Sequence, residues 1–254
     1  MDTRNPTLWI AALVCALAIC LWPGAPAHAE QTTDVSSRIL AGLKSKEEGA
    51  LTEAIAESVE AHNSTDDKAT RKKIQAALGK ALKNKKGGLS RARAATALGQ
   101  LNDPEGAWKQ LAKTLPSPKE NSASALHTEV LKAVAKLTPE KAVAPLLKLA
   151  SKVKSPALLA EAATTLGAYG ASKQRTKILG ALLDVLQRRW EAAEAASRNP
   201  KGGNAGDAWR IVGEPLVAAL NALTGQNLTD AQAWLAARKE HKKKLDGLFG
   251  DSTK

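Results

Sequence analysis

The chain has 254 residues, and its 37 Lys and Arg against 25 Asp and Glu give a net charge of +12. Such a balance favours attraction to polyanions and does not indicate a fold. Both cysteines, Cys15 and Cys20, fall in a segment that we expect to be removed, which excludes disulfides, thiol catalysis and cysteine-ligated metals from the mature protein.

Residues 1–29 have the pattern of an export signal. Arg4 precedes an apolar run from Leu8 to Trp22, and Ala27-His28-Ala29 offers small residues to a signal peptidase. The run is short for a membrane span, although an uncleaved N-terminal anchor is the alternative. We therefore expect a periplasmic or extracellular protein whose mature domain is residues 30–254. Acidic polysaccharide, lipid phosphate and extracellular DNA are the polyanions it would meet.

The N-terminal part of the mature chain predicts two helices. Residues 34–62 contain an amphipathic helix whose apolar side includes Ile55, and we expect it to cap an array of helices. A polar turn follows at 63–67, and a second helix is predicted over 67–82. Residues 83–88 form a charged link that contains glycine.

Further along, helix starts are marked by a capping residue followed by proline, which fits the first helical position because the amide there has no partner. These pairs are Asp103-Pro104, Thr138-Pro139 and Ser155-Pro156, and Ser122 and Ser172 supply further caps. Helices then begin about every 17 residues, which leaves room for roughly three turns and a tight connection. Consecutive helices are therefore predicted to be antiparallel neighbours.

A repeat underlies this rhythm. Gly99 is predicted to end a helix in the left-handed conformation, and Asp103-Pro104 begins the partner helix. Residues 91–101, 127–137 and 159–169 align with one another, matching Leu98 with Val134 and Leu166. A helical hairpin cannot bury both of its faces alone, so repeated hairpins are expected to stack into a solenoid.

A family resemblance rests on Arg91-x-x-Ala94-Ala95-x-Ala97-Leu98-Gly99-x-Leu101-x-Asp103-Pro104, followed by Leu111 and Leu115. This segment resembles a HEAT repeat of the phycobilisome-lyase-like subtype. The resemblance implies an all-α fold: an α-solenoid of about five stacked antiparallel helix hairpins in a right-handed superhelix. The sequence departs from the family at Ser90, where Val is usual, and at His127 and Leu159, where the family has Arg.

The C-terminal part is interrupted by RNPKGGNAGD at 198–207, which predicts an irregular loop. Beyond it, Thr229-x-x-Gln232 is a capping box for a last helix that carries Trp234. The string Leu223-Thr224-Gly225-Gln226 also resembles the terminal segment of secreted bacterial HEAT-like proteins.

No catalytic, cofactor or metal motif is present. His62, His127 and His241 are far apart in the sequence and lack the spacing of metal ligands, and nucleophile-elbow, P-loop and dinucleotide-binding patterns do not occur. We therefore predict no enzyme, no metal and no cofactor. Four tryptophans are expected to pack in the core, with a stacking surface for sugars or bases as the alternative. They are Trp108, Trp190, Trp209 and Trp234.

Basic residues gather in one region, which predicts a positive field there. The cluster consists of Lys68, Arg71, Lys72, Lys73, Lys80, Lys83, Lys85, Lys86, Arg91 and Arg93. The candidate partner-binding residues are Arg71, Lys72, Lys80, Lys83, Arg91 and Arg93. A solvated face that keeps the protein soluble is the alternative.

These features predict a monomeric, non-enzymatic binding or scaffold protein of the bacterial envelope that contacts another protein. Two alternatives stay open. The basic region 68–93 could bind an acidic polymer, or the chain could share the bilin-lyase activity that the resemblance implies for some relatives.

Overall fold

The computed structural model describes residues 27–198, 204–241 and 245–249, and all regular elements in these ranges are helices. The all-α prediction is confirmed for this part of the chain. The α-helices are α2 (Ala27–Gly42), α3 (Glu48–Ser64), α4 (Lys68–Lys83), α5 (Gly88–Leu98), α6 (Pro104–Leu111), α7 (Ala125–Leu137), α8 (Val143–Lys152), α9 (Pro156–Gly167), α10 (Arg175–Arg198), α11 (Ala205–Thr224) and α12 (Ala231–Glu240). Short 3-10 helices are η1 (Ala112–Thr114), η2 (Glu140–Ala142) and η3 (Leu245–Leu248).

The chain divides into two compact units, residues 1–38 and residues 39–254, and the packing described below concerns the second unit. Most of the predicted export signal, residues 1–26, and residues 199–203 of the predicted loop lie outside the described residues. Among the helices that are described, none combines the length and hydropathy needed to cross a membrane.

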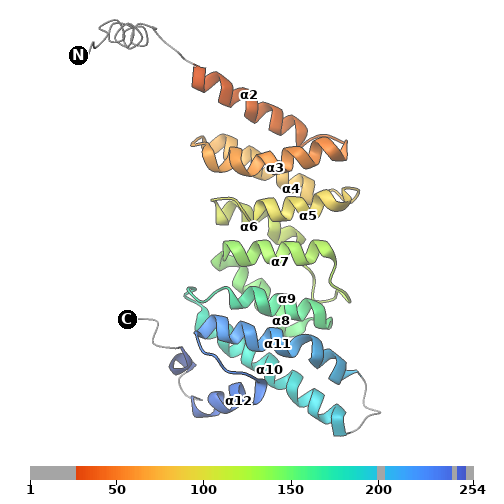
Figure 1. The fold of residues 1–254 in the computed structure, drawn as a ribbon, viewed down its shortest axis with the longest axis vertical. Coiled ribbons are helices and arrows are strands. Elements are labelled where there is room, and N and C mark those ends of the chain that lie inside the picture. Colours follow the sequence, from red (N-terminus) through yellow and green to blue (C-terminus); the bar gives the residue numbers. More distant parts are fainter. Residues whose placement is uncertain (1–26, 199–203, 242–244, 250–254) are drawn as a thin grey trace, which may run out of the picture. The chain divides into compact units, whose positions relative to one another are not determined.

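Helices of the second unit pack mainly against neighbours in the sequence. One series runs α3, α5, α7, α9 and α11, each helix packing on the next, as Figure 1 shows. The helices between them form a second series, in which α4 packs on α6 and α8 packs on α10. A continuous set of buried apolar side chains fills the space between the two series.

The aligned segments occupy equivalent helices. Residues 91–101, 127–137 and 159–169 correspond to α5, α7 and α9, which are consecutive members of the first series. The matched residues Leu98, Val134 and Leu166 are all completely buried. The alignment therefore matched three apolar side chains that all face the core.

Two of the predicted capping pairs start helices as expected. Asp103 accepts a hydrogen bond from the amide of Gly106 at 2.9 Å, and Pro104 is the first residue of α6. Ser155 accepts from the amide of Leu158 at 3.4 Å, and Pro156 begins α9.

The prediction that Thr138-Pro139 starts a helix in the same way was wrong. Thr138 ends α7 in the left-handed region at φ 41°, and Pro139 precedes η2 instead of opening α8. Proline disfavours a right-handed helical conformation in the residue before it, so the Thr138-Pro139 pair works here as a helix stop.

Two other predicted caps lie one or two residues from the observed ones. Ser124, and not Ser122, caps α7 by accepting from the amide of His127 at 3.2 Å. Asp230, and not Thr229, caps α12 by accepting from the amide of Ala233 at 2.8 Å. In each case several residues with a suitable oxygen stand side by side, and the backbone entry into the helix selects one of them.

Gly99 ends α5 as predicted, but its conformation was predicted wrongly. Its φ of −70° and ψ of −6° are right-handed, so the left-handed region does not explain the glycine. Close packing does, because a Cβ on Gly99 would come within 2.7 Å of the Cα of Ala133 on α7. Gly167 on α9 is similar, with Ala219 of α11 at 2.9 Å. These glycines let neighbouring helices of the first series approach closely.

The tryptophans pack as core or next to it. Trp108 is 6 % exposed, and Trp234 is fully buried. Trp190 and Trp209 are partly buried and meet edge to face, with their ring centroids 5.2 Å apart. The core interpretation is therefore confirmed for Trp108 and Trp234, and the other two form a pair between α10 and α11.

Candidate functional site

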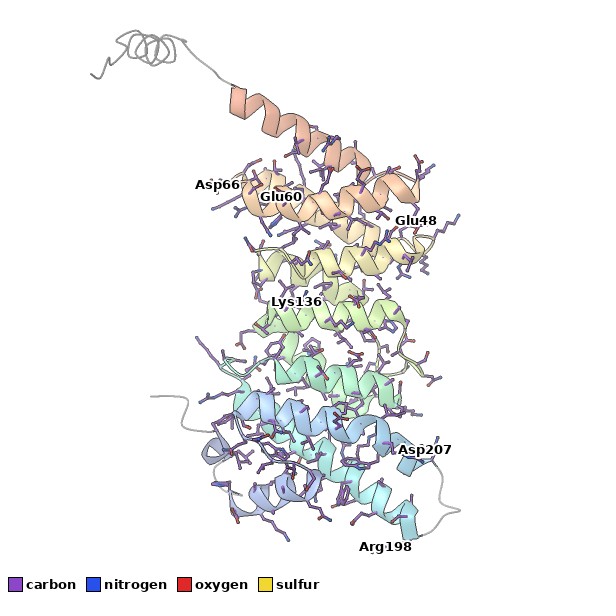
Figure 2. All side chains as sticks on the ribbon, viewed as in Figure 1. Glu48, Glu60, Asp66, Lys136, Arg198 and Asp207 are labelled. Atoms are coloured by element: carbon purple, nitrogen blue, oxygen red, sulfur yellow. The ribbon has the colours of Figure 1, made fainter. Side chains whose placement is uncertain are left out.

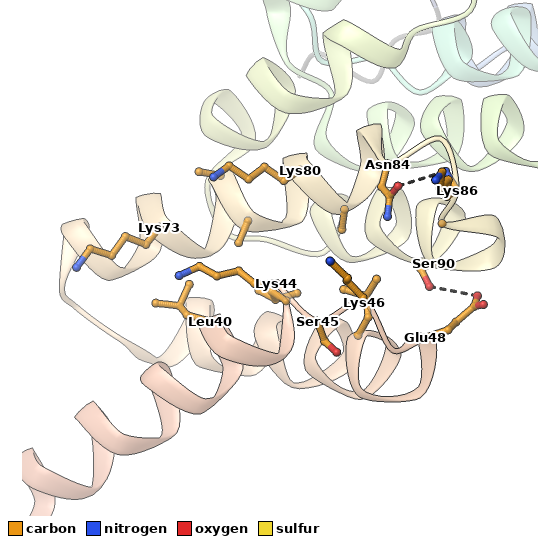
Figure 3. A pocket seen from close by; sticks show the side chains of 16 residues that line it. Leu40, Lys44, Ser45, Lys46, Glu48, Lys73, Lys80, Asn84, Lys86 and Ser90 are labelled. Carbon is orange, nitrogen blue, oxygen red and sulfur yellow. Dashed lines mark hydrogen bonds between the residues drawn. The ribbon is translucent and has the colours of Figure 1, made fainter.

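A groove of about 950 Å³ lies beside α4. One wall is formed by residues 40–51, which comprise the end of α2, a turn and the start of α3, and the other wall is formed by α4 (Figure 3). The groove ends at the turn before α5. Its size is in the range of sites that hold small molecules or short peptide segments.

Lysine side chains dominate the polar lining of this groove. Lys73 and Lys80 come from α4, Lys44 and Lys46 come from the facing turn, and Lys86 comes from the turn before α5. Within the part of the chain that the structure describes, none of the five takes part in an ion pair. The groove therefore has a surplus of positive charge that its own residues do not neutralise.

Glu48 is the acidic residue of the lining, and it lies at one edge. Its Oε1 accepts a hydrogen bond from the hydroxyl of the buried Ser90 at 3.3 Å, which ties the start of α3 to α5. Asp66 and Glu60 lie towards the opposite end of α3, away from the groove (Figure 2). Asp67, the cap of α4, interacts with the charge of Lys73, and the other four lysines of the lining have no acidic neighbour of this kind among the described residues.

The floor of the groove is apolar. Leu43, Leu51, Ala77 and Ala81 are buried, and Leu40 is partly buried. These side chains are short or face the core, so they do not fill the space between the two rows of lysines. The groove therefore combines a non-polar base with a cationic rim.

Local hydrogen bonds hold the groove walls in place. Asp67 caps α4 by accepting from the amides of Ala69 and Thr70, each at 3.0 Å. The hydroxyl of Thr70 and these amides hold the pKa of the Asp67 carboxyl below its usual range. At the other end of α4, Asn84 Oδ1 accepts from the amide of Lys86 at 3.2 Å, and Gly88 takes a positive φ of 42°. This tight turn brings Lys86 to the end of the groove.

The predicted arginines are committed to the fold. The Nε of Arg71 donates to the carbonyl of Thr65 at 2.7 Å, and the Nε of Arg91 donates to the carbonyl of Leu82 at 3.0 Å. Arg93 donates to the hydroxyl of Thr52 at 2.7 Å, joining α5 to α3. Arg71 satisfies a carbonyl in the link between α3 and α4, and Arg91 satisfies one in the last turn of α4, where helix carbonyls lack intrahelical partners.

The three predicted lysines lie in different places. Lys80 lines the groove, whereas Lys72 is exposed and Lys83 lies near Lys113. Loss of solvent around its amine, and then the like charge of Lys113, lower the pKa of Lys83. Of the six predicted residues, the structure therefore brings Lys80 alone into the groove.

Sequence reasoning missed Lys44 and Lys46, and it assigned no special role to Lys73 and Lys86 within the basic cluster. The sequence carries no clear signal for them, because Lys44-Ser-Lys46 falls in the segment 34–62, which the sequence pattern predicts as one helical region, whereas the structure places a turn there between α2 and α3. Only the packing of this turn across α4 places its lysines opposite Lys73 and Lys80.

A cluster of hydrogen-bonded polar side chains around the buried His62 stabilises the fold. His62 is fully buried, and its Nε2 accepts from the side-chain amide of Gln75 at 3.0 Å. The same amide donates to Asp103 at 2.9 Å, and His62 Nδ1 lies 3.0 Å from the side-chain oxygen of Asn63. These bonds link the end of α3 and the middle of α4 to the start of α6. They are satisfied within the protein and leave no free group for a ligand.

The described residues offer no cluster that would form a metal site. Among the residues that the structure describes, no group of three or more His, Cys, Asp or Glu side chains is placed to hold a metal ion. His127 and His241 lie on α7 and at the end of α12, far apart along the chain.

The chain matches no known family model, no curated protein and no solved structure. The groove is therefore interpreted from its own chemistry.

Proposed function

We propose that the chain is a non-enzymatic binding or scaffold protein of the bacterial envelope, built as a HEAT-like, right-handed α-solenoid, that contacts another protein. The packing of helices on others one or two places away in the chain supports the repeat architecture. The observation that carries the binding role is the groove beside α4, whose five lysines form no ion pair in the described part of the fold, although Lys73 lies close enough to Asp67 to lower the pKa of its carboxyl. The acidic surface they need would come from the partner.

This proposal is tested by photo-crosslinking in the native host. A benzophenone amino acid replaces Ala76, which lines the groove on α4 and is exposed, and in a matched variant it replaces Ala56, which is exposed on α3 outside the groove. We expect a discrete protein adduct from position 76 and none from position 56. The absence of an adduct at position 76 in cells that produce the folded protein under several growth conditions contradicts the proposal.

A second candidate is electrostatic binding of an acidic polymer through the basic region 68–93. The lysine surplus of the groove and the exposed Lys72 and Lys85 favour it. This function predicts that affinity for heparin or DNA falls steeply as salt is raised, because exposed charges are screened within about 8 Å at physiological ionic strength. Binding that is unchanged between low and high salt contradicts it.

A further inference from the structure

We propose that the groove beside α4 receives an acidic amphipathic α-helix of the partner. This inference rests on the proposed protein-binding function and specifies the chemistry of the bound segment. The segment presents apolar side chains to the floor of the groove and carboxylates to the lysines on both sides.

The charge distribution fits this occupant. Lys73 and Lys80 line one side of the groove, and Lys44 and Lys46 line the other, with the apolar floor between them (Figure 3). A helix that carries acids on both flanks of an apolar stripe would meet cations on each side. Apolar side chains alone would leave the lysines without partners, and charge alone would leave Leu40 and Ala76 in contact with water.

The open side of α4 has the spacing of a helix-packing face. Lys73, Ala76, Ala77, Lys80, Ala81 and Asn84 are the residues of α4 and its cap that line the groove, and they recur at steps of three and four. They span about 16 Å along the helix axis, which is roughly three turns. The small side chains between the lysines allow a second helix axis to come close, in the way that packed helices interlock.

The chain itself provides an example of this arrangement at α10. There α12, a helix of 10 residues, packs against the side of α10. Trp234 of α12 is fully buried in the core, and Arg238 of α12 donates to Asp184 of α10 at 2.5 Å and to Gln187 at 3.1 Å. A short helix with one apolar anchor and flanking charges thus covers a helix of the second series. In the proposed complex the charges are reversed, because the bound helix carries the acids and α4 carries the lysines.

Other anionic ligands match the lining less well. The groove lining contains no aromatic and no arginine side chain, so it offers neither a stacking surface for sugars and bases nor a planar fork for phosphate. Polysaccharide and nucleic acid would gain from charge alone and would not use the apolar floor.

Binding of designed peptides to the purified protein tests the inference. The probe is a fluorescent helical peptide with a leucine and alanine stripe flanked by glutamates, and its control is a scrambled peptide of the same composition that has no stripe. We expect the striped peptide to bind at least about ten-fold more tightly. Equal affinities, or tighter binding of heparin or of vesicles with anionic lipid, overturn the inference.

Matched pairs of variants test whether the peptide binds in the groove. Lys80→Glu reverses a charge in the groove and Lys148→Glu reverses an exposed charge on α8, outside it, while Ala76→Trp fills the groove and Ala56→Trp adds the same bulk elsewhere. We expect Lys80→Glu and Ala76→Trp each to weaken peptide binding about ten-fold or more, and the two controls to bind like the wild type. Thermal unfolding of each variant shows that the fold is retained. Equal effects of a groove variant and its control overturn the inference.

The two proposals fail in different ways. If position 76 crosslinks a native protein and the striped peptide gains no affinity over the scrambled one, the protein-binding function stands and the helical ligand is wrong. If neither experiment gives a signal, both are wrong.

Discussion

Two helices of the second series, α4 and α10, differ in what covers their outward sides. The side of α10 is covered by the chain's own C-terminal segment, in which α12 and η3 pack against it, Arg175 stacks on the ring of Phe249 and Gln226 donates to the carbonyl of Leu248. The side of α4 that carries Lys73 and Lys80 borders an open groove. The same kind of helical surface is thus closed in one place and available to a ligand in the other.

The difference lies in the side chains. The cover of α10 contributes Trp234, which is fully buried, and Leu248, which is 3 % exposed. The groove at α4 contains alanines and lysines, whose ammonium groups would be costly to bury without partners. Covering α4 therefore requires a segment that supplies carboxylates, and this requirement leads to the ligand proposed above.

The largest effect is expected from removing the anchor of the C-terminal cover. Trp234→Ala should lower the free energy of unfolding by about 3–5 kcal/mol, because it leaves a cavity where a large side chain was buried. Denaturant unfolding followed by circular dichroism measures it. Leu89→Ala is the control, since Leu89 is 67 % exposed and should change stability by no more than about 0.5 kcal/mol. A similar small change for Trp234→Ala would mean that α12 does not stabilise α10.

A smaller loss is expected from separating two helices of the first series, which both regions share. Gly99→Ala places a Cβ 2.7 Å from the backbone of Ala133, so α5 and α7 must move apart at a cost of about 1–3 kcal/mol. Gly49→Ala is the matched control on α3, where an added Cβ meets nothing within 4 Å. It should stabilise by about 0.5–1 kcal/mol through helix propensity. Chemical unfolding of both variants should therefore give shifts of opposite sign.

The polar junction near α4 should give an effect that depends on pH. Asp103→Ala removes the cap of α6 and the partner of Gln75, at a cost of about 1 kcal/mol at neutral pH. The amides of Gln75 and Gly106 hold the pKa of Asp103 below its ordinary value of 3.8. Its carboxylate therefore stabilises the fold above pH 3.8, and this contribution is lost as the pH falls through the lower, folded-state pKa.

Unfolding curves measured between pH 7 and about pH 2 should show the gap between wild type and Asp103→Ala narrowing on the acid side. Glu120→Ala, at an exposed position, should show no such change. A constant gap would mean that the carboxylate charge does not contribute.

The smallest effect on stability is expected in the groove itself. Lys44→Glu and Lys80→Glu should change the free energy of unfolding by no more than about 0.5 kcal/mol, because neither ammonium group has an acidic partner in the described part of the fold. Differential scanning calorimetry measures this. A marked stabilisation by either change would indicate that the lysines repel one another strongly in the free protein.

Part of the candidate site could be predicted from the sequence. The basic character of region 68–93 was visible in the composition, and Lys80 was among the residues chosen. Arg71 and Arg91 do not line the groove, and each guanidinium donates to a nearby backbone carbonyl. The sequence does not show which carbonyl lies within reach of an arginine.

The sequence by itself determined the features that depend on near neighbours. Asp103 and Ser155 cap their helices through amides three residues away. Leu98, Val134 and Leu166 are buried on helices whose apolar residues recur at steps of three and four, which places those residues on one side of the helix. The tertiary structure alone decided the contacts between distant segments. Lys44 lines the groove opposite Lys80, and Gly99 packs against Ala133. These contacts form because the burial of a shared apolar surface brings separate helices together, and a local sequence pattern does not contain that information.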